Sequence, residues 1–242
     1  MSLAALLKEI ILLFVQACML AGCYSTEQQI IGSGECVSVK KSISGFSSVS
    51  ISSGCKAEIS RADSFSVIII TDDNIHPYVE TWKDGNTLNV QFEATNSYMP
   101  TDFKAIISCP DLITVSASNS TDIVFKDIFV KENCLIQLSD MSLLTGNING
   151  KNLTLNLSAG SKSDITGCFD SLTIYATGNS RCLVPFLNVN NCYVTMSGSS
   201  EADISAAGVI SGLLSSVSKL YYSGNPLSVT VTTSGEATVI KR

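Results

Sequence analysis

Three aspartates recur in similar surroundings in the second half of the chain. Asp122, Asp164 and Asp203 each follow a Ser-rich run and each precede an Ile. Carboxylates at a repeated spacing could bind calcium or sugar, or could act in pairs on a glycosidic bond. In alternate coils of a stacked repeat they would lie about 9.6 Å apart, since adjacent strands are about 4.8 Å apart. That separation is too long for one shared cation, and the commoner role of Asp at such a position is to cap a turn.

The other reactive residue types form no recognisable catalytic or metal site. His76 is the single histidine and precedes a proline, so a multi-histidine metal centre is excluded. The nine cysteines include no CxxC pair, and no phosphate-binding loop or nucleophile elbow is present. Aromatic side chains could form a platform for sugars or could cover the core: Tyr78, Trp82, Tyr98, Tyr221 and Tyr222. We therefore expect no cofactor, no metal and no catalysis.

The N-terminus is typical of a bacterial lipoprotein signal. Lys8 is followed by an apolar run and then by Leu20-Ala21-Gly22-Cys23, which matches a lipobox. Cleavage after residue 22 would leave a lipidated Cys23 and a polar tether over residues 23–34. Lys8 and Glu9 keep the apolar run well short of the roughly 20 residues that a membrane span needs. The prediction is a lipid-anchored protein of a Gram-negative-type cell envelope, most simply of the outer membrane; a plain secreted protein is the alternative.

Seven cysteines remain beyond the signal and the lipidated residue, so they cannot all pair with one another: Cys36, Cys55, Cys109, Cys134, Cys168, Cys182 and Cys192. Cys134 and Cys192 fall at core positions of the repeat described below. They would lie three coils apart, roughly 14 Å, which is too far for a disulfide. Free buried thiols are favoured there, while the states of Cys109, Cys168 and Cys182 are left open.

The elements that would carry these residues form a repeat. The segments SASNSTDI, SAGSKSDI and SGSSEADI are alike, and equivalent first residues recur 17–23 positions apart: Ser116, Ser139, Ser158, Thr177, Ser197, Ser215 and Thr232. Apolar residues stand one and three positions before most of these residues, and a small residue, usually Ser, stands three after. Stacked units of this kind bury a continuous core, so the period predicts a parallel β-solenoid. An antiparallel sandwich of evenly spaced hairpins is the alternative.

The first half of the chain is strand-rich but irregular. The segment VSISSGCKAEI, residues 49–59, matches one coil of the repeat. Further strand-like runs follow, and Lys83-Asp84-Gly85-Asn86 is a hairpin turn between two of them. We expect one all-β domain over residues 35–242. Its residues 35–115 would be a mostly antiparallel region with the first coil, and residues 116–242 would form the solenoid.

Several short motifs in this order resemble the family of putative auto-transporter adhesins with a head GIN domain. They are Gly45-Phe46-Ser47-Ser48-Val49-Ser50-Ile51, Gly54, Asp72-Asp73-Asn74-Ile75, Pro77-Tyr78-Val79-Glu80, Asp84-Gly85-Asn86-Thr87-Leu88, Tyr222-Ser223-Gly224-Asn225-Pro226 and Ser234-Gly235. The resemblance extends over roughly residues 45–240. It implies a right-handed β-helix on a secreted or lipid-anchored protein, and it implies no established activity.

Composition narrows the function classes. A formal net charge of −6 argues against a nucleic-acid partner, and 45% hydrophobic with 15% charged residues excludes a disordered tail or a coiled coil. We predict a non-enzymatic envelope lipoprotein whose solenoid is a scaffold or an adhesion-like binding surface for a glycan or a protein. The alternatives are a carbohydrate-active enzyme that uses the surface carboxylates, and assembly through exposed end coils.

Overall fold

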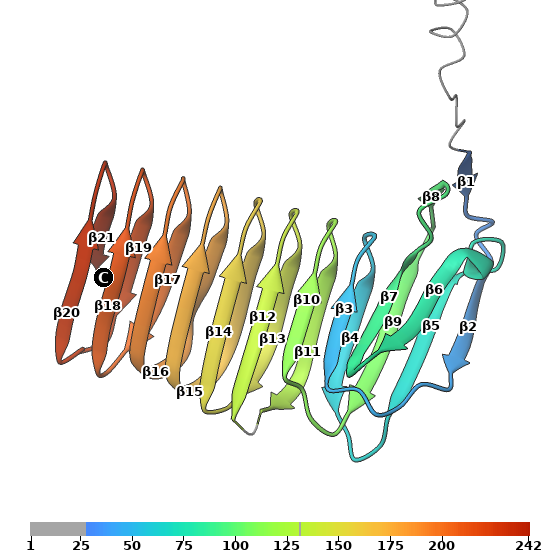
Figure 1. Ribbon diagram of the computed structural model, residues 1–242, viewed down its shortest axis with the longest axis horizontal. Helices are drawn as coiled ribbons and strands as arrows, with labels where there is room; N and C mark the ends of the chain where they lie inside the picture. Colours follow the sequence, from blue (N-terminus) through green and yellow to red (C-terminus); the bar gives the residue numbers. More distant parts are fainter. Residues whose placement is uncertain (1–27, 131) are drawn as a thin grey trace, which may run out of the picture.

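The computed structural model describes residues 28–130 and 132–242, which are almost entirely β-strands (Figure 1). A single 3-10 turn, η1 (His76–Tyr78), is the helical element among them. The predicted signal peptide with its Leu20-Ala21-Gly22 site, and Cys23 after it, lie outside these residues. Within the described part of the chain, no helix has the length and apolar character needed to cross a membrane.

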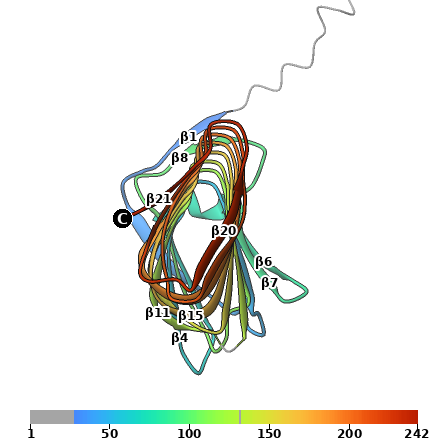
Figure 2. The same cartoon turned by 90° about the vertical axis from the view of Figure 1, so that its left-hand side faces the viewer.

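The strands wrap into two faces that enclose one core (Figures 1 and 2). The first face contains, in spatial order, β6 (Val79–Asp84), β7 (Thr87–Phe92), β3 (Ser48–Ile51), β10 (Thr114–Ala117), β12 (Asn133–Leu138), β14 (Asn152–Leu157), the second halves of β15 (Lys162–Ala176) and β16 (Arg181–Met196), β18 (Val209–Leu214) and β20 (Ser228–Thr233).

The second face contains β2 (Cys36–Lys41), β5 (Ser66–Asp72), β9 (Phe103–Cys109), β4 (Lys56–Arg61), β11 (Asp122–Phe129), β13 (Leu143–Asn149), the first halves of β15 and β16, β17 (Glu201–Ala206), β19 (Lys219–Ser223) and β21 (Thr238–Lys241). From β3 and β4 onward every pairing is parallel. The predicted β-solenoid is therefore confirmed, and the alternative of stacked hairpins is wrong.

The register of the coils differs from the predicted one at both ends of the repeat. Ala117 pairs with Leu138, and Leu214 pairs with Thr233. The residues equivalent to Ser139 and Ser215 are therefore Ser118 and Ser234, two positions beyond the predicted Ser116 and Thr232. Side chains of a strand alternate between its two sides, so a shift of two residues keeps every apolar residue inward. The hydrophobic pattern alone cannot detect such a shift.

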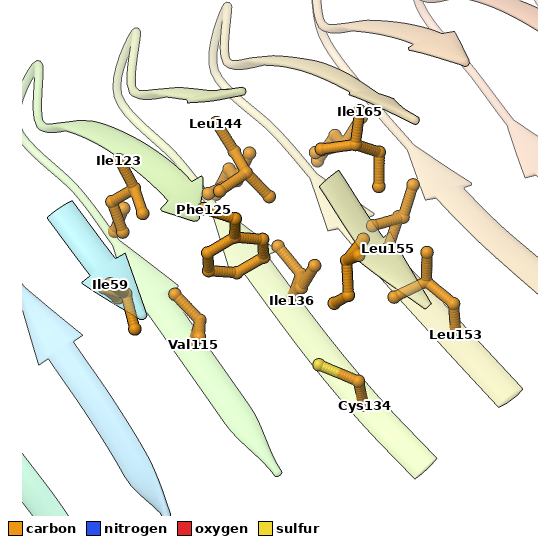
Figure 3. Close-up of a cluster of buried hydrophobic side chains, with 14 of the residues drawn as sticks. Ile59, Val115, Ile123, Phe125, Cys134, Ile136, Leu144, Leu153, Leu155 and Ile165 are labelled. Carbon is orange, nitrogen blue, oxygen red and sulfur yellow. The ribbon is translucent and has the colours of Figure 1, made fainter. Parts of the chain in front are cut away.

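The core is a stack of inward-facing ladders between the two faces. Leu155 is completely buried and pairs along the solenoid with Ile136 and Ile174, which are buried as well. Figure 3 shows this packing, with side chains from both faces meeting in one apolar layer. Each such side chain contributes about 1.5–3 kcal/mol of burial free energy. A single coil could not bury them, so the stack is what makes the fold stable.

Buried serines hold the turn at which each coil passes from the first face to the second. Ser161 Oγ donates to the carbonyl of Leu138 at 3.0 Å, and Ser200 Oγ donates to that of Ala176 at 3.2 Å. Each bond joins one coil to the coil before it. Small polar residues at the corners thus bond to the backbone of the neighbouring coil. In the corrected register the row consists of Thr121, Ser142, Ser161, Ser180, Ser200, Ser218 and Ala237, in place of Asn119 and Gly235 at its ends.

The N-terminal region closes one end of the solenoid. β5 is antiparallel to both β2 and β9, and β6 and β7 form the predicted hairpin. Parallel pairs of β3 with β7 and of β4 with β9 join this region directly to the first coil. The predicted mostly antiparallel region, continuous with the solenoid, is confirmed. At the other end, β20 and β21 each pair on one side only among the described strands, and the assembly hypothesis stays a prediction.

Part of the segment predicted as a tether is folded onto the domain. β1 (Gln29–Ile31) pairs with β8 (Ser97–Met99), and the buried Asp72 accepts hydrogen bonds from the backbone N–H groups of Gly34 and Thr101, both at 2.8 Å. Burial raises the pKa of the Asp72 carboxyl, but these bonds and one from the Thr101 hydroxyl outweigh it, so the pKa lies below its usual value. Residues 29–34 are therefore part of the folded domain.

The seven described cysteines are all unpaired in this structure. Cys134 and Cys192 are buried and lie in one inward row, separated by Leu153 and Leu172, so the predicted separation of three coils is confirmed. Cys55, Cys109 and Cys182 are buried too, whereas Cys36 and Cys168 are exposed. Burial raises the pKa of the Cys109 thiol to about 11, which keeps it protonated and unreactive at neutral pH.

Candidate functional site

The second face carries the charges of the solenoid, and several of them pair across neighbouring strands. Lys104 Nζ lies 2.7 Å from Glu58 Oε1, and Arg181 Nη2 lies 3.3 Å from Glu201 Oε2. The Lys104 ammonium holds the pKa of the Glu58 carboxyl below its usual value. This surface, made of the outward residues of β4, β9, β11, β13, β17, β19, β21 and the first halves of β15 and β16, is called the charged face below.

The three candidate aspartates all lie on the charged face, but not in one row. Asp122 pairs with Leu143, in the row that continues to Lys162 and Arg181, while Asp164 and Asp203 lie in the next row on either side of Leu183. The three aspartates look equivalent in the sequence only when Ser116 is aligned with Ser158, whereas in the structure Ser118 is the residue equivalent to Ser158. Asp122 is the first residue of β11, directly after the turn, whereas Asp164 and Asp203 lie inside β15 and β17.

Asp203 is already engaged within the protein. The residue is 7% exposed, and its carboxylate forms an ion pair with Arg242. The Arg242 guanidinium also lies over the Tyr221 ring, 4.1 Å from the ring centroid. Carboxylate and ring thus fasten the C-terminal strand to the last coils, and neither is presented to a ligand. Asp122 and Asp164 are exposed to solvent.

The aromatic residues considered as a sugar platform are spread over the molecule. Tyr98 packs against Tyr78 and Phe92 at ring-centroid distances of 5.5 and 4.7 Å, and covers the N-terminal end of the core. Trp82 lies on β6 at the edge of the first face and is 40% exposed. His76 is half-buried in η1, and its burial together with Lys41 lowers the pKa of the imidazole. The proposed platform therefore does not form.

The first face differs from the second in having no Asp, Glu, Lys, Arg or His over most of its length. Nine segments contain none: β3, β7, β10, β12, β14, residues 171–176 of β15, residues 191–196 of β16, β18 and β20. Their outward residues are Ser, Thr, Asn and Gln with a few Tyr, Leu and Val. This surface is called the uncharged face below. Lys, Glu, Asp and Arg are the usual residues of protein surfaces, so the segregation is specific to this fold.

Hydrogen bonds between side chains run across the uncharged face. Asn152 Nδ2 donates to Asn133 Oδ1 at 2.8 Å, and Ser171 Oγ donates to Asn152 Oδ1 at 2.6 Å. In the parallel row nearer the turns, Ser116 Oγ donates to Gln137 Oε1 at 3.2 Å. These bonds order the amides and hydroxyls, so the face presents fixed donors and acceptors to solvent.

A hollow of about 420 Å³ lies on the uncharged face where the strands approach the turns. Its lining residues come from consecutive coils and are all uncharged: Ser50, Ser116, Ala117, Ser118, Gln137, Leu138, Ser139, Asn156, Leu157, Ser158, Tyr175 and Thr177. Asn156 Oδ1 is buried there and has no hydrogen-bond partner among the described atoms. Tyr175, the next residue in this row, is 44% exposed.

Tyr175 and Tyr193 were missed as candidates in the sequence. Both are large, exposed rings, at 44% and 40%, and both lie at outward positions of the uncharged face. The sequence does indicate that Tyr175 faces outward, because it stands between the inward residues Ile174 and Ala176 of the same strand. Only the register shows that Tyr175 pairs with Thr195 and Tyr193 with Thr173, which makes the two rings diagonal neighbours.

Solved structures share this architecture. A putative adhesin from Bacteroides fragilis has a TM-score of 0.82 and 15% identity, covering 88% of this chain and 100% of that one. A putative lipid binding protein from Parabacteroides distasonis has a TM-score of 0.70 and 15% identity, covering 89% and 100%. A putative adhesin from Parabacteroides merdae has a TM-score of 0.66 and 18% identity, covering 88% and 99%. At such identities the likeness shows the fold alone.

No curated protein matches the chain. The model of a family described as putative auto-transporter adhesin, head GIN domain, matches residues 45–226, which include the first coil, the N-terminal region from residue 45 onward and most of the solenoid. The fold and the order of the motifs agree with that match. The chain belongs to the head GIN domain family of putative auto-transporter adhesins.

Proposed function

We propose that this protein is a non-enzymatic, lipid-anchored protein of the cell envelope that binds its partner through the uncharged face. The observation that carries the proposal is the segregation of charge between the two faces. Several charges of the charged face pair with one another, whereas the uncharged face offers amides, hydroxyls and two exposed tyrosines. Convergent polar groups beside exposed aromatic rings are typical of a binding surface.

The adhesin family and its envelope setting support a binding role. The lipobox at residues 20–23 supports attachment to a membrane through Cys23, with the outer membrane of a Gram-negative-type bacterium as the proposed location. A rigid solenoid suits this role, because stacked coils hold their outward side chains at fixed spacings of about 4.8 Å. The partner can then be recognised by a preformed surface, without the entropy cost of ordering a loop.

Placing a charge on either face tests the proposal. Thr154 and Thr145 are half-buried outward residues of neighbouring coils, on the uncharged and the charged face respectively. We expect Thr154→Lys to abolish binding of the soluble form, residues 24–242, to its partner on arrays of glycans and envelope proteins, because it buries an unpaired ammonium in the contact. The matched variant Thr145→Lys should bind normally. Loss of binding in Thr145→Lys alone would place the binding surface on the other face.

A carbohydrate-active enzyme is the alternative function, and one feature of the charged face favours it. Glu58, Asp102 and Asp122 line a hollow of about 400 Å³ together with Lys56 and Lys104. Lys104 pairs with Glu58, so that carboxylate is ionised and less suited to act as a general acid. The alternative requires that the soluble form releases reducing ends from a polysaccharide and that Asp122→Asn abolishes the release.

A further inference from the structure

We propose that the hollow beside Tyr175 is a binding site for an uncharged glycan. This inference rests on the proposed function and specifies the chemical class of the ligand and where on the uncharged face it lies. Its elements are a pair of exposed rings, an amide oxygen without a hydrogen-bond partner, and a lining that contains no Asp, Glu, Lys, Arg or His.

The two tyrosines supply a platform for sugar rings. Tyr175 and Tyr193 project from adjacent strands, and their register places them about 4.8 Å apart across the strands and about 6.6 Å apart along them. A glycan chain presents apolar C–H faces at a comparable repeat, so successive sugar units can stack on the two rings. Tyrosine suits such a contact because its body is apolar and its hydroxyl can still bond to water or to the sugar.

The amides of the hollow supply hydrogen bonds to sugar hydroxyls. Asn156 Oδ1 is buried without a partner, which costs free energy in the unbound protein. A ligand hydroxyl that reaches this oxygen by displacing the exposed side chains around it recovers that cost. Gln137 lines the same hollow, and its Oε1 accepts from Ser116 Oγ, so its amide N–H groups point to other acceptors. Amides and hydroxyls together can match both the donors and the acceptors of a sugar.

The ligand is uncharged because the site offers nothing that could pair with a charge. No Asp, Glu, Lys, Arg or His lines the hollow, and Asp140, the charged residue beside it, accepts a hydrogen bond from the Ser139 hydroxyl at 2.8 Å. A carboxylate or sulfate brought here would lose its hydration without gaining a partner, and the net charge of −6 would repel it. A neutral polysaccharide meets neither penalty.

The test uses the soluble form, residues 24–242, and immobilised oligosaccharides of two kinds: neutral fragments of glucan, mannan and xylan, and acidic fragments that carry uronate or sulfate. We expect binding to one or more neutral fragments, with little change between low and high salt. Tyr175→Ala should weaken that binding by a factor of about 30, as for an aromatic residue at the centre of an interface. Tyr175→Phe, which keeps the ring, should retain most of it.

The second part of the test introduces a charge into the hollow. Gln137→Glu should abolish binding to the neutral fragments, whereas Thr145→Glu, with the same new charge on the charged face, should not. Binding to acidic fragments only, or neutral binding that Tyr175→Ala and Gln137→Glu leave unchanged, would overturn this assignment. If a protein ligand binds and Thr154→Lys blocks it while no glycan binds, the glycan site is refuted and the proposed binding surface stands.

Discussion

Replacing Leu155 with Asp is expected to abolish the cooperative unfolding transition of the soluble form. Leu155 is completely buried at the centre of an inward ladder, between Ile136 and Ile174. Loss of its packing alone costs about 2–5 kcal/mol, and an unpaired carboxylate in the same place costs more. Domains are typically stable by only about 5–15 kcal/mol, so most or all of the folded population should be lost. Thermal denaturation followed by circular dichroism measures this directly.

The neighbouring residue supplies the control for this variant. Thr154 belongs to the same strand but faces outward, so Thr154→Asp adds the same carboxylate in contact with solvent. We expect its melting temperature to stay within a few degrees of the unmodified protein, as for other surface substitutions. A normal transition for Leu155→Asp, or equal losses for the two variants, would mean that the inward and outward assignment of this strand is wrong.

Replacing Cys23 with Ala is expected to release the protein from the membrane fraction and to abolish palmitate labelling. In the proposed lipoprotein, Cys23 carries the acyl chains, and no helix among residues 28–130 and 132–242 is long and apolar enough to cross a membrane. Two or more acyl chains anchor a protein stably, while their complete loss leaves only weak surface attraction. The measurement is fractionation of labelled cells that express the full chain.

Cys36→Ala is the matched control for the anchor. Cys36 is the first exposed cysteine of the described chain, and its loss should change neither labelling nor fractionation. Labelling that persists in Cys23→Ala and disappears in Cys36→Ala would assign the lipid to a different residue. Labelling absent from both the unmodified protein and the variants would refute the anchor.

Much of the fold could be predicted from the sequence because every coil of a stacked repeat needs the same local pattern of inward apolar and outward polar residues. The alternation of apolar and polar residues in segments such as Leu153–Leu157 identifies an inward side, and the serine at each corner fixes the turn. The residue pairing between strands could not be predicted from the same pattern. A shift of two residues preserves the alternation, so the sequence pattern fits Ser116 as well as Ser118. The pairing of Ala117 with Leu138 shows that Ser118 is the residue equivalent to Ser139.

The candidate site was harder to predict than the fold for a related reason. Asp122, Asp164 and Asp203 are candidates in the sequence because carboxylates can bind cations and catalyse hydrolysis. In the structure Asp203 forms an ion pair with Arg242, and Asp122 lies in a different row from Asp164. The uncharged face becomes visible only when outward residues from nine separate segments are stacked in register. Tyr175 and Tyr193 are 18 positions apart in the chain, and only pairing between coils makes them neighbours.

The central claim is that the uncharged face is the binding surface, and NMR chemical-shift mapping of the soluble form with bound partner tests it most directly. We predict that the perturbed amides cluster in β12, β14 and the second halves of β15 and β16, around Asn156 and Tyr175. Amides of β11, β13 and β17, on the opposite side of the same coils, should be unchanged. Perturbations centred on β11, β13 and β17 would contradict the account.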